Sequence, residues 1–260
     1  MLVCSDTFRN LYSASRKFFM KSSRRQFLSL PALAAGQTSA AHGTKIVCVG
    51  GHPDDPESGC GGTLARYAAL GASVTIVYLT RGEAGIPRKS HDEAAAIRSA
   101  ECAAACRILG AKPVFAGQID GATVVDKAAA ESLRALIFAE DPDVLFTQWP
   151  IDTHLDHQAA GTLAYRAWLA ARGRFELYYY EVDLGAQTMS FHPTDYVDVS
   201  GVRDKKKAAL FAHKSQDGER IYREFHEPME GYRGRESGCG AAEAFVHLAR
   251  VHSGTKLPGL

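Results

Sequence analysis

The sequence predicts an α/β fold: a Rossmann-like, three-layer sandwich with a mostly parallel sheet. Short apolar runs rich in β-branched residues alternate along the chain with segments of helical periodicity. The strand-like runs are almost continuously apolar, which is typical of strands that helices cover on both faces. Since ligands of such sheets bind beyond the carboxyl ends of the strands, polar residues that directly follow a strand-like run are the first candidates for a functional site.

Six segments are expected to be strands because each is short and dominated by β-branched, aromatic or other apolar residues. They are residues 45–49, 73–79, 114–116, 144–147, 177–182 and 196–199. The aromatic run within the fifth of these segments is expected to serve strand packing.

Four helices are expected between these strands because apolar residues recur there at helical spacing. They are residues 63–70, 90–109, 128–139 and 158–171. Ser90 and Glu93 form a capping box at the start of the second helix, and Gly110 supplies its stop.

Two further stretches have local interpretations. Gly59, Gly61 and Gly62 are not followed by the Lys-Ser/Thr of a phosphate-binding loop, so we expect them to let a helix approach the first strand closely. From residue 201 onward the pattern is less regular, and the basic stretch 205–207 is expected to be a solvated face.

The composition is that of an ordinary globular protein: of 260 residues, 46% are hydrophobic and 23% charged. Lysine and arginine total 30 against 29 aspartates and glutamates, so no net basic field suggests nucleic acid as a partner. No apolar stretch reaches the ~20 residues needed to span a bilayer. The sequence leaves a homo-oligomer open.

Residues 1–41 are expected to be a twin-arginine (Tat-type) signal peptide and not part of the fold. Residues 23–28 (SRRQFL) resemble the twin-arginine motif, and residues 39–41 (SAA) offer a cleavage site of small residues. Met20 would give a signal of conventional length, so we expect the true start there. The alternative is a basic tail. The signal predicts an exported, periplasmic or extracellular protein with one domain, residues 42–260.

The cysteines show neither a CxxC pair nor the spacing of a zinc ribbon. Cys102 and Cys106 lie four residues apart on an expected helix, where they would share a face. We expect them to behave as small buried apolar side chains. No disulfide is predicted among the six cysteines, which are Cys4, Cys48, Cys60, Cys102, Cys106 and Cys239.

Two clusters of histidine and aspartate directly follow the first and the fourth strand-like runs. They consist of His52, Asp54 and Asp55, and of His154, Asp156 and His157. Charged groups at the end of a buried strand are costly unless something pairs with them. A divalent metal is a natural partner, since a catalytic zinc takes three imidazole or carboxylate ligands and keeps one position open. The surplus of candidates matters because hydrolysis at a metal also needs a base and an acid.

These motifs carry a family resemblance. Residues 51–57 (GHPDDPE) resemble the first motif, HPDD, of the PIG-L/LmbE-type zinc-dependent N-deacetylases, and residues 154–157 (HLDH) resemble their second motif. Further matches in the same order are residues 61–64 (GGTL), 79–85 (LTRGEAG), 98–101 (RSAE) and 213–216 (HKSQ). The resemblance implies an enzyme that removes the acetyl group from an N-acetylglucosamine-type amide, in an N-acetylated sugar or glycoconjugate.

The resemblance also implies a cofactor, Zn²⁺ or another divalent metal, and a role for each candidate. The implied metal ligands are His52, Asp55 and His157. Asp54 resembles the general base that deprotonates the zinc-bound water, and His154 the acid that stabilises the oxyanion or protonates the leaving amine. We expect flanking carboxylates to keep the pKa of His154 high. Asp156 would orient a neighbouring histidine. The implied substrate contacts are Arg98, Asp120, Arg81 and Glu57.

Two positions depart from the family pattern. Pro56 stands where many members have glutamate directly after the two aspartates, and Leu155 replaces the usual proline of the second motif. Neither change removes a candidate ligand, but we expect Pro56 to shift Glu57. Two other functions stay open at this point: a metal-dependent amidase or esterase acting on another acylated small molecule or glycan, and a non-catalytic exported sugar-binding protein.

Two of the implied substrate contacts also have simpler explanations. Arg98 and Glu101 are spaced to form an ion pair on a helix surface. Asp120 precedes Gly121, and Asp-Gly is a turn signature on its own.

Overall fold

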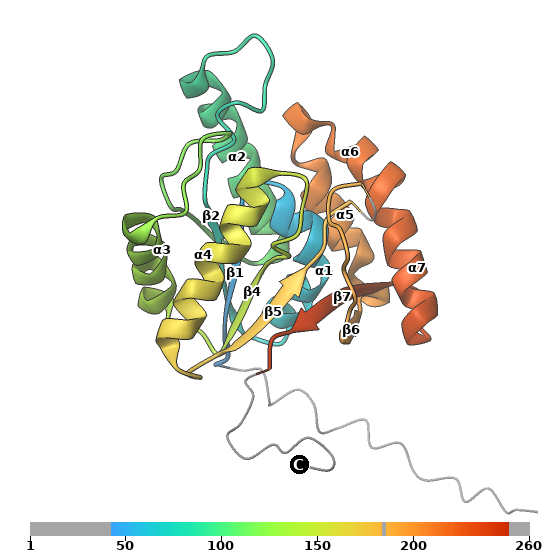
Figure 1. Cartoon of the computed structure of the whole chain (residues 1–260). Helices are drawn as coiled ribbons and strands as arrows, with labels where there is room; N and C mark the ends of the chain where they lie inside the picture. The colour runs from blue at the N-terminus through green and yellow to red at the C-terminus, as the bar shows by residue number, and fades with distance from the viewer. Residues whose placement is uncertain (1–42, 184–185, 250–260) are drawn as a thin grey trace, which may run out of the picture. The chain divides into compact units, whose positions relative to one another are not determined.

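The part of the chain that the computed structural model describes, residues 43–183 and 186–249, folds around one seven-stranded mixed sheet (Figure 1). The expected α/β architecture is confirmed. The strand order is β3-β2-β1-β4-β5-β7-β6; β1 to β5 are parallel, and β7 runs antiparallel to both of its neighbours. The strands are β1 (Lys45–Gly50), β2 (Ser73–Tyr78), β3 (Lys112–Phe115), β4 (Val144–Gln148), β5 (Glu176–Tyr180), β6 (Asp195–Asp198) and β7 (Ala242–His247). The predicted export signal lies outside the described residues.

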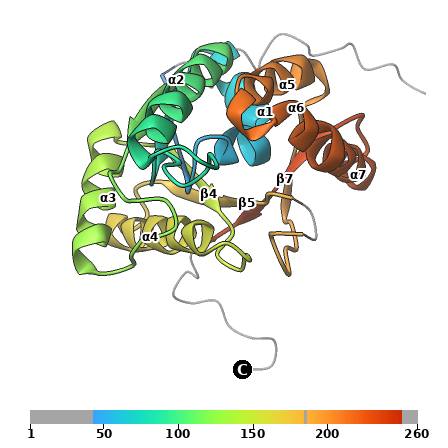
Figure 2. The same ribbon diagram turned by 90° about the horizontal axis from the view of Figure 1, so that it is seen from above.

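Helices cover both faces of the sheet (Figure 2). They are α1 (Asp55–Ala69), α2 (His91–Leu109), α3 (Lys127–Glu140), α4 (Leu155–Ala171), α5 (Arg203–Phe211), α6 (Gly218–Ile221) and α7 (Glu227–Ser237), with short turns η1 (Ser200–Val202), η2 (Lys214–Gln216) and η3 (Tyr222–His226). Side chains of α1, α2 and α5 form one apolar core, and those of α3 and α4 form the other. None of the described helices is long and apolar enough to cross a membrane.

The strand order reverses between β1 and β4. The chain continues from β1 through α1 to β2 on one side, and from β4 through α4 to β5 on the other. The two crossover helices lie on opposite faces of the sheet, so a crevice opens at the carboxyl ends of this strand pair, where ligands of such folds bind. Both histidine–aspartate clusters follow these two strands.

Helix α1 begins at Asp55, eight residues before the predicted start at residue 63. The prediction was wrong there because Gly59, Gly61 and Gly62 lower helix propensity. Tertiary packing overrides that propensity: a methyl group at Gly59 would overlap the ring of Tyr180, and one at Gly62 would lie 2.7 Å from Val199 Cγ1. These glycines therefore let α1 approach β5 and the segment before α5 closely. The expected close approach to the first strand at these positions was wrong.

The caps of α2 and the buried cysteines agree with the sequence, whereas one strand of the sheet was not predicted. Ser90 and Glu93 form the predicted capping box of α2, and Gly110 caps its end in a left-handed conformation. Cys102 and Cys106 are buried and free. Strand β7, which joins the sheet between β5 and β6, was not predicted because it lies in the less regular region after residue 201.

Lys206 is fully buried, so the expected solvated face of residues 205–207 is wrong at its central residue. Its Nζ lies 2.9 Å from Glu230 Oε1 and 2.7 Å from Glu243 Oε1. Burial alone would lower the pKa of Lys206, but the two carboxylates raise it above its usual value. Glu243 also accepts hydrogen bonds from the backbone N–H groups of Gly62 and Thr63, which ties β7 to α1. The sequence pattern missed this site because α7 and β7 supply the counter-charges.

Replacing Lys206 by methionine should lower the free energy of unfolding by about 3–5 kcal/mol, because it leaves the buried Glu243 carboxylate without a cation and Glu230 with Arg203 alone. Urea unfolding monitored by circular dichroism measures the change. The matched control is Lys205→Met at the exposed neighbouring position, which should stay within about 0.5 kcal/mol of the parent. Equal effects of the two substitutions would contradict the buried ion-pair assignment.

Candidate metal centre

The two clusters occupy the N-terminal ends of α1 and α4. Asp54 is the N-cap of α1, with φ 107°, a conformation that residues other than glycine rarely adopt. Pro56 stands in the first turn of that helix, where its missing N–H costs nothing. His154 is the N-cap of α4, and its Nδ1 accepts a hydrogen bond from the backbone N–H of Asp156, 3.2 Å away.

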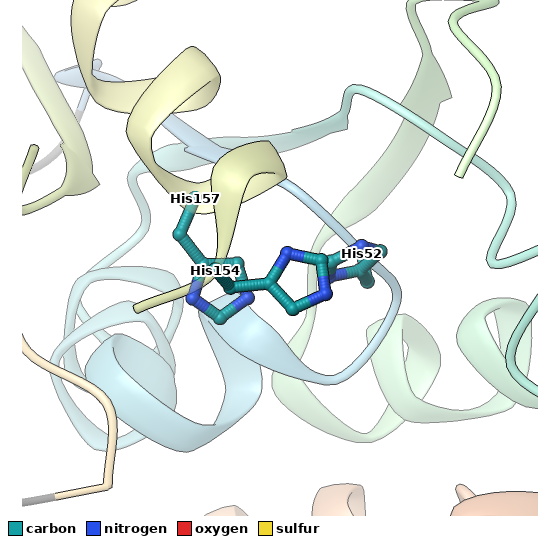
Figure 3. Close-up of side chains that lie close together, drawn as sticks. All are labelled: His52, His154 and His157. Atoms are coloured by element: carbon teal, nitrogen blue, oxygen red, sulfur yellow. The ribbon is translucent and has the colours of Figure 1, made fainter. Parts of the chain in front are cut away.

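Three imidazole rings converge between these helix ends (Figure 3). The ring centroid of His154 lies 4.6 Å from that of His52 and 4.7 Å from that of His157. One nitrogen from each ring lies within 4.8 Å of the others, close enough for the three to share one metal ion.

Asp55 connects the two clusters. Its Oδ2 lies 3.1 Å from Nδ1 of His52, and its Oδ1 lies 3.3 Å from Nε2 of His157. The Oδ2 atom also accepts a hydrogen bond from the backbone N–H of His52 at 2.7 Å. One carboxylate thus contacts both of the other predicted ligands, although those ligands are 105 positions apart in the sequence.

Two more carboxylates face the other nitrogen of His52. Its Nε2 lies 3.1 Å from Asp120 Oδ1 and 2.9 Å from Asp156 Oδ2. This trio forms a second group that could hold a metal. Asp156 is fixed by Gly121 and Thr123, which donate hydrogen bonds to its two oxygens. Asp156 therefore contacts His52, which is the kind of contact that its expected orienting role requires.

The site carries a surplus of negative charge that shifts its pKa values. Burial alone would lower the pKa of His52, but Asp120, Asp156 and Asp55 raise it well above its usual value. Burial acts in the same direction on His157, where Asp55 and Asp152 instead raise the pKa to about 9. Burial would raise the pKa of Asp55, yet the two imidazoles hold it well below its usual value. A cation that bound between these groups would have to displace the protons of His52 and His157.

His154 differs from this pattern and corrects a prediction. Partial burial, together with the nearby His52 and His157, lowers its pKa below the usual value, and Asp156 does not offset them. The expectation that flanking carboxylates keep this pKa high was wrong, because those carboxylates contact the other two imidazoles more closely.

The donor set fits a divalent metal. Two groups of donors share His52: the three imidazoles, and His52 with the carboxylates of Asp120 and Asp156. Imidazole nitrogens and carboxylate oxygens are both ligands that zinc accepts. The raised pKa of His157 and the lowered pKa of Asp55 come from their mutual contact, so a cation bound there would have to displace the proton of His157. Asp55 contacts both neighbouring histidines, as a third ligand would.

Asp54 and Arg98 form a buried ion pair beside this set. Arg98 Nη2 lies 3.0 Å from Asp54 Oδ2, and the same atom donates a hydrogen bond to the carbonyl of Pro53. Gly82 and Gly85 leave room for the guanidinium, since a methyl group at either would overlap it. Arg98 is only 3% exposed, so the alternative of a surface pair with Glu101 is excluded.

A cavity of about 450 Å³ opens over the site. Of the predicted site residues, it is lined by His52, Asp54, Asp55, Arg98, Asp120, His154 and His157. Asp156 lies beneath this lining. Arg81 is exposed and pairs with Glu83, and neither residue lines the cavity.

Glu57 also lies beneath the cavity and is fully buried. Its Oε2 accepts a hydrogen bond from the backbone N–H of Asp54 at 3.2 Å. Its Oε1 accepts from the hydroxyl of Tyr78 at 2.8 Å and lies 3.1 Å from His213 Nε2. Glu57 does not line the cavity, so the structure places it where it supports Asp54 and not where it could contact a substrate.

Comparison with known proteins decides the family. A family model described as GlcNAc-PI de-N-acetylase (PIG-L) matches residues 47–168. A diacetylchitobiose deacetylase of Thermococcus kodakarensis is 30% identical over 229 residues, which cover 78% of this chain and 85% of the relative. The chain belongs to the PIG-L family of N-deacetylases. It is therefore an enzyme, a hydrolase acting on amide bonds, as the sequence motifs implied.

Two further proteins resemble this PIG-L-family enzyme. A 1D-myo-inositol 2-acetamido-2-deoxy-alpha-D-glucopyranoside deacetylase of Mycobacteroides abscessus is 29% identical, with 66% of this chain and 81% of the relative covered. The structure of N,N'-diacetylchitobiose deacetylase from Pyrococcus horikoshii superimposes with a TM-score of 0.71 at 24% identity, covering 79% of this chain and 84% of that one. The second likeness concerns the fold.

Sequence reasoning missed Asp152 in this PIG-L-family site. Its Oδ1 lies 3.2 Å from Nδ1 of His157, on the side of the ring opposite Asp55, and accepts a hydrogen bond from the backbone N–H of His154. Its Oδ2 accepts from the hydroxyl of Thr188. The sequence did contain an indication of this role, because a carboxylate two residues before a histidine cluster at a strand end is spaced to orient those rings.

Zinc affinity of the metal-free protein should rise steeply from pH 6 to pH 9. The raised pKa of His157, about 9, and of His52 mean that both rings are protonated at neutral pH and must lose protons before they bind a metal. Each ring should contribute up to about tenfold per pH unit. Titration calorimetry in buffers of different ionisation enthalpy should show proton release on Zn²⁺ addition. A constant affinity over this range would contradict the assignment.

Proposed function

We propose that the protein is a zinc-dependent deacetylase that removes the acetyl group from an N-acetylglucosamine-type amide. The observation that carries the proposal is the contact of Asp55 with both His52 and His157, beside the ion pair of Asp54 and Arg98. The relatives named above are deacetylases of N-acetylated amino sugars, which supports this substrate class.

In this proposal His52, Asp55 and His157 hold the metal. Bound there, zinc would polarise the scissile carbonyl and lower the pKa of the attacking water. Asp152 keeps the His157 ring in place from behind, at 3.2 Å. Asp156, with Gly121 and Thr123 bound to it, does the same for His52.

Asp54 acts as the general base. Burial raises the pKa of its carboxyl, and the Arg98 guanidinium limits that rise, so the group can accept a proton closer to neutral pH than a free aspartate can. Asp54 lines the cavity while its Oδ2 contacts Arg98 at 3.0 Å. Glu57 fixes the backbone of Asp54 in its left-handed conformation.

His154 donates a hydrogen bond to the developing oxyanion, and the leaving amine takes the proton that Asp54 has removed from the water. Because its Nδ1 accepts the N–H of Asp156, the neutral ring carries its proton on Nε2. The lowered pKa favours this neutral form. The Nε2–H group is therefore a preset donor, and neutral donors of this kind stabilise oxyanions effectively in buried sites. Arg98 and Asp120 are the proposed contacts of the sugar.

Asp54→Asn should keep the bound metal and lose about 10²–10⁴-fold in kcat, because the shape of the side chain stays and the base is lost. Acetate release from N-acetylglucosamine and N,N'-diacetylchitobiose measures turnover, and elemental analysis measures the metal. Asp195→Asn, on the edge strand β6, is the control and should retain full turnover.

Chelator-insensitive acetate release by the parent enzyme would falsify the metal mechanism. Normal turnover of Asp54→Asn would remove Asp54 as the base. Release of a different acyl group from a panel of acylated amines and esters, with both sugars inert, would replace the proposed substrate class.

We also propose that residues 1–41 direct export through the twin-arginine pathway and are then removed. The sequence features that support this are the arginine pair at residues 24–25 and the small residues at 39–41. N-terminal sequencing of the exported protein should begin near His42. An intact arginine pair in that material would contradict the proposal.

A further inference from the structure

A second histidine–aspartate pair lies on another side of the same cavity, and the mechanism above does not use it. Asp183 follows β5, and His226 ends η3; both line the cavity together with Gln187 and Ile221. The sheet order places β5 and β3 on opposite sides of the β1–β4 pair. The pair therefore lies on the flank opposite Asp120, which follows β3, with the metal centre between them.

The pair is built into the protein core. His226 is 1% exposed, and its Nε2 lies 3.1 Å from Asp183 Oδ1. Its Nδ1 is buried and has no hydrogen-bond partner among the described residues. A buried imidazole with an unused nitrogen is uncommon, because leaving a buried polar atom unpaired costs about 1–3 kcal/mol.

Two unusual backbone conformations hold the pair in position. His226 ends a π-helical turn, Tyr222–His226, and such turns occur frequently at functional sites. Asp183 has φ 46°, in the left-handed region that favours glycine. Backbone conformations of this kind cost free energy and cluster where ligands are bound. Both features therefore point to a function for the pair beyond packing.

The charges around the cavity indicate what such a subsite would accept. Among the cavity-lining residues in the described ranges, Arg98 is the one arginine or lysine, and it pairs with Asp54. The Asp183 carboxylate thus pairs with a histidine, and the one arginine among the described residues that line the cavity is already paired with Asp54. A phosphate or carboxylate placed there would meet a negative charge, whereas a hydroxyl group could donate to it. Val182 and Ile221 supply apolar contacts for the C–H face of a ring.

We propose that Asp183 and His226 form a subsite for a neutral, hydroxylated sugar ring, and that this subsite selects against anionic substituents on the substrate. Asp183 accepts a hydrogen bond from a sugar hydroxyl, and His226 positions its carboxylate. The proposal names the substrate class of the deacetylase site described above and rests on that function.

The test compares neutral and phosphorylated sugars on four zinc-loaded variants. Asp183→Asn and His226→Gln change the pair with little change of shape. Glu176→Gln and His247→Gln are matched controls, since these two residues form a similar pair, 2.7 Å apart, outside the cavity. The substrates are N,N'-diacetylchitobiose and N-acetylglucosamine 6-phosphate, and all variants are checked for folding and zinc content.

The subsite predicts that Asp183→Asn and His226→Gln raise KM for diacetylchitobiose about tenfold, with kcat within about twofold of the parent. Asp183→Asn should also raise kcat/KM for the phosphorylated sugar relative to the neutral one, because the repulsive charge is gone. The controls should match the parent. A purely structural role would lower kcat for both substrates together, and that result would overturn the proposal.

Equilibrium binding separates this proposal from the proposed function. Diacetylchitobiose is titrated into zinc-loaded Asp54→Asn with and without Asp183→Asn. Tenfold weaker binding in the double variant supports the subsite even where the parent releases no acetate, in which case only the deacetylase proposal fails. Equal binding by the two proteins, or no binding by either, overturns the subsite. Parent enzyme that takes the phosphorylated sugar as readily as the neutral one overturns it as well.

Discussion

The contacts of Asp55 with His52 and His157 are the interaction on which the rest of the site depends. They join the residues after β1 to the residues after β4, the two strands between which the sheet order reverses. A carboxylate and two imidazoles buried this deeply must compensate one another or share a cation. The pairing of β1 with β4 and the early start of α1 bring these groups together. The fold thus creates the electrostatic demand that a metal would satisfy.

Around this interaction lies a layer of side chains that hold the proposed ligands and the proposed base without lining the cavity. Asp152 and Asp156 fix the rings of His157 and His52 from outside. Glu57 holds the backbone of Asp54 in a conformation that the chain would otherwise avoid. Each contact removes a degree of freedom before any substrate arrives, which is how preorganised sites lower activation barriers. Pro56, one of the departures from the family pattern, lies in the first turn of α1, and Glu57 after it contacts the backbone of Asp54.

The sequence predicted the parts of this protein that depend on local pattern or on motif order. The parallel sheet, the alternation of its helices and the meeting of both clusters at one edge follow from apolar periodicity and topology. Contacts between distant segments could not be predicted in this way. Lys206 was assigned to solvent because its partners, Glu230 and Glu243, lie on elements that periodicity did not show. Helix propensity hid the first turns of α1, whose glycines serve packing against Tyr180. The low pKa of His154 depends on distances that no spacing gives.

The most direct test of the central claim is a crystal structure of the zinc-loaded enzyme with data collected on both sides of the zinc absorption edge. The account predicts one anomalous peak per chain, within bonding distance of His52, Asp55 and His157, with Asp54 free of the metal. A peak coordinated by His52, Asp120 and Asp156, the other group of donors at this edge of the sheet, would contradict the assignment of the ligands. The absence of any peak in this cavity would contradict the metal centre itself.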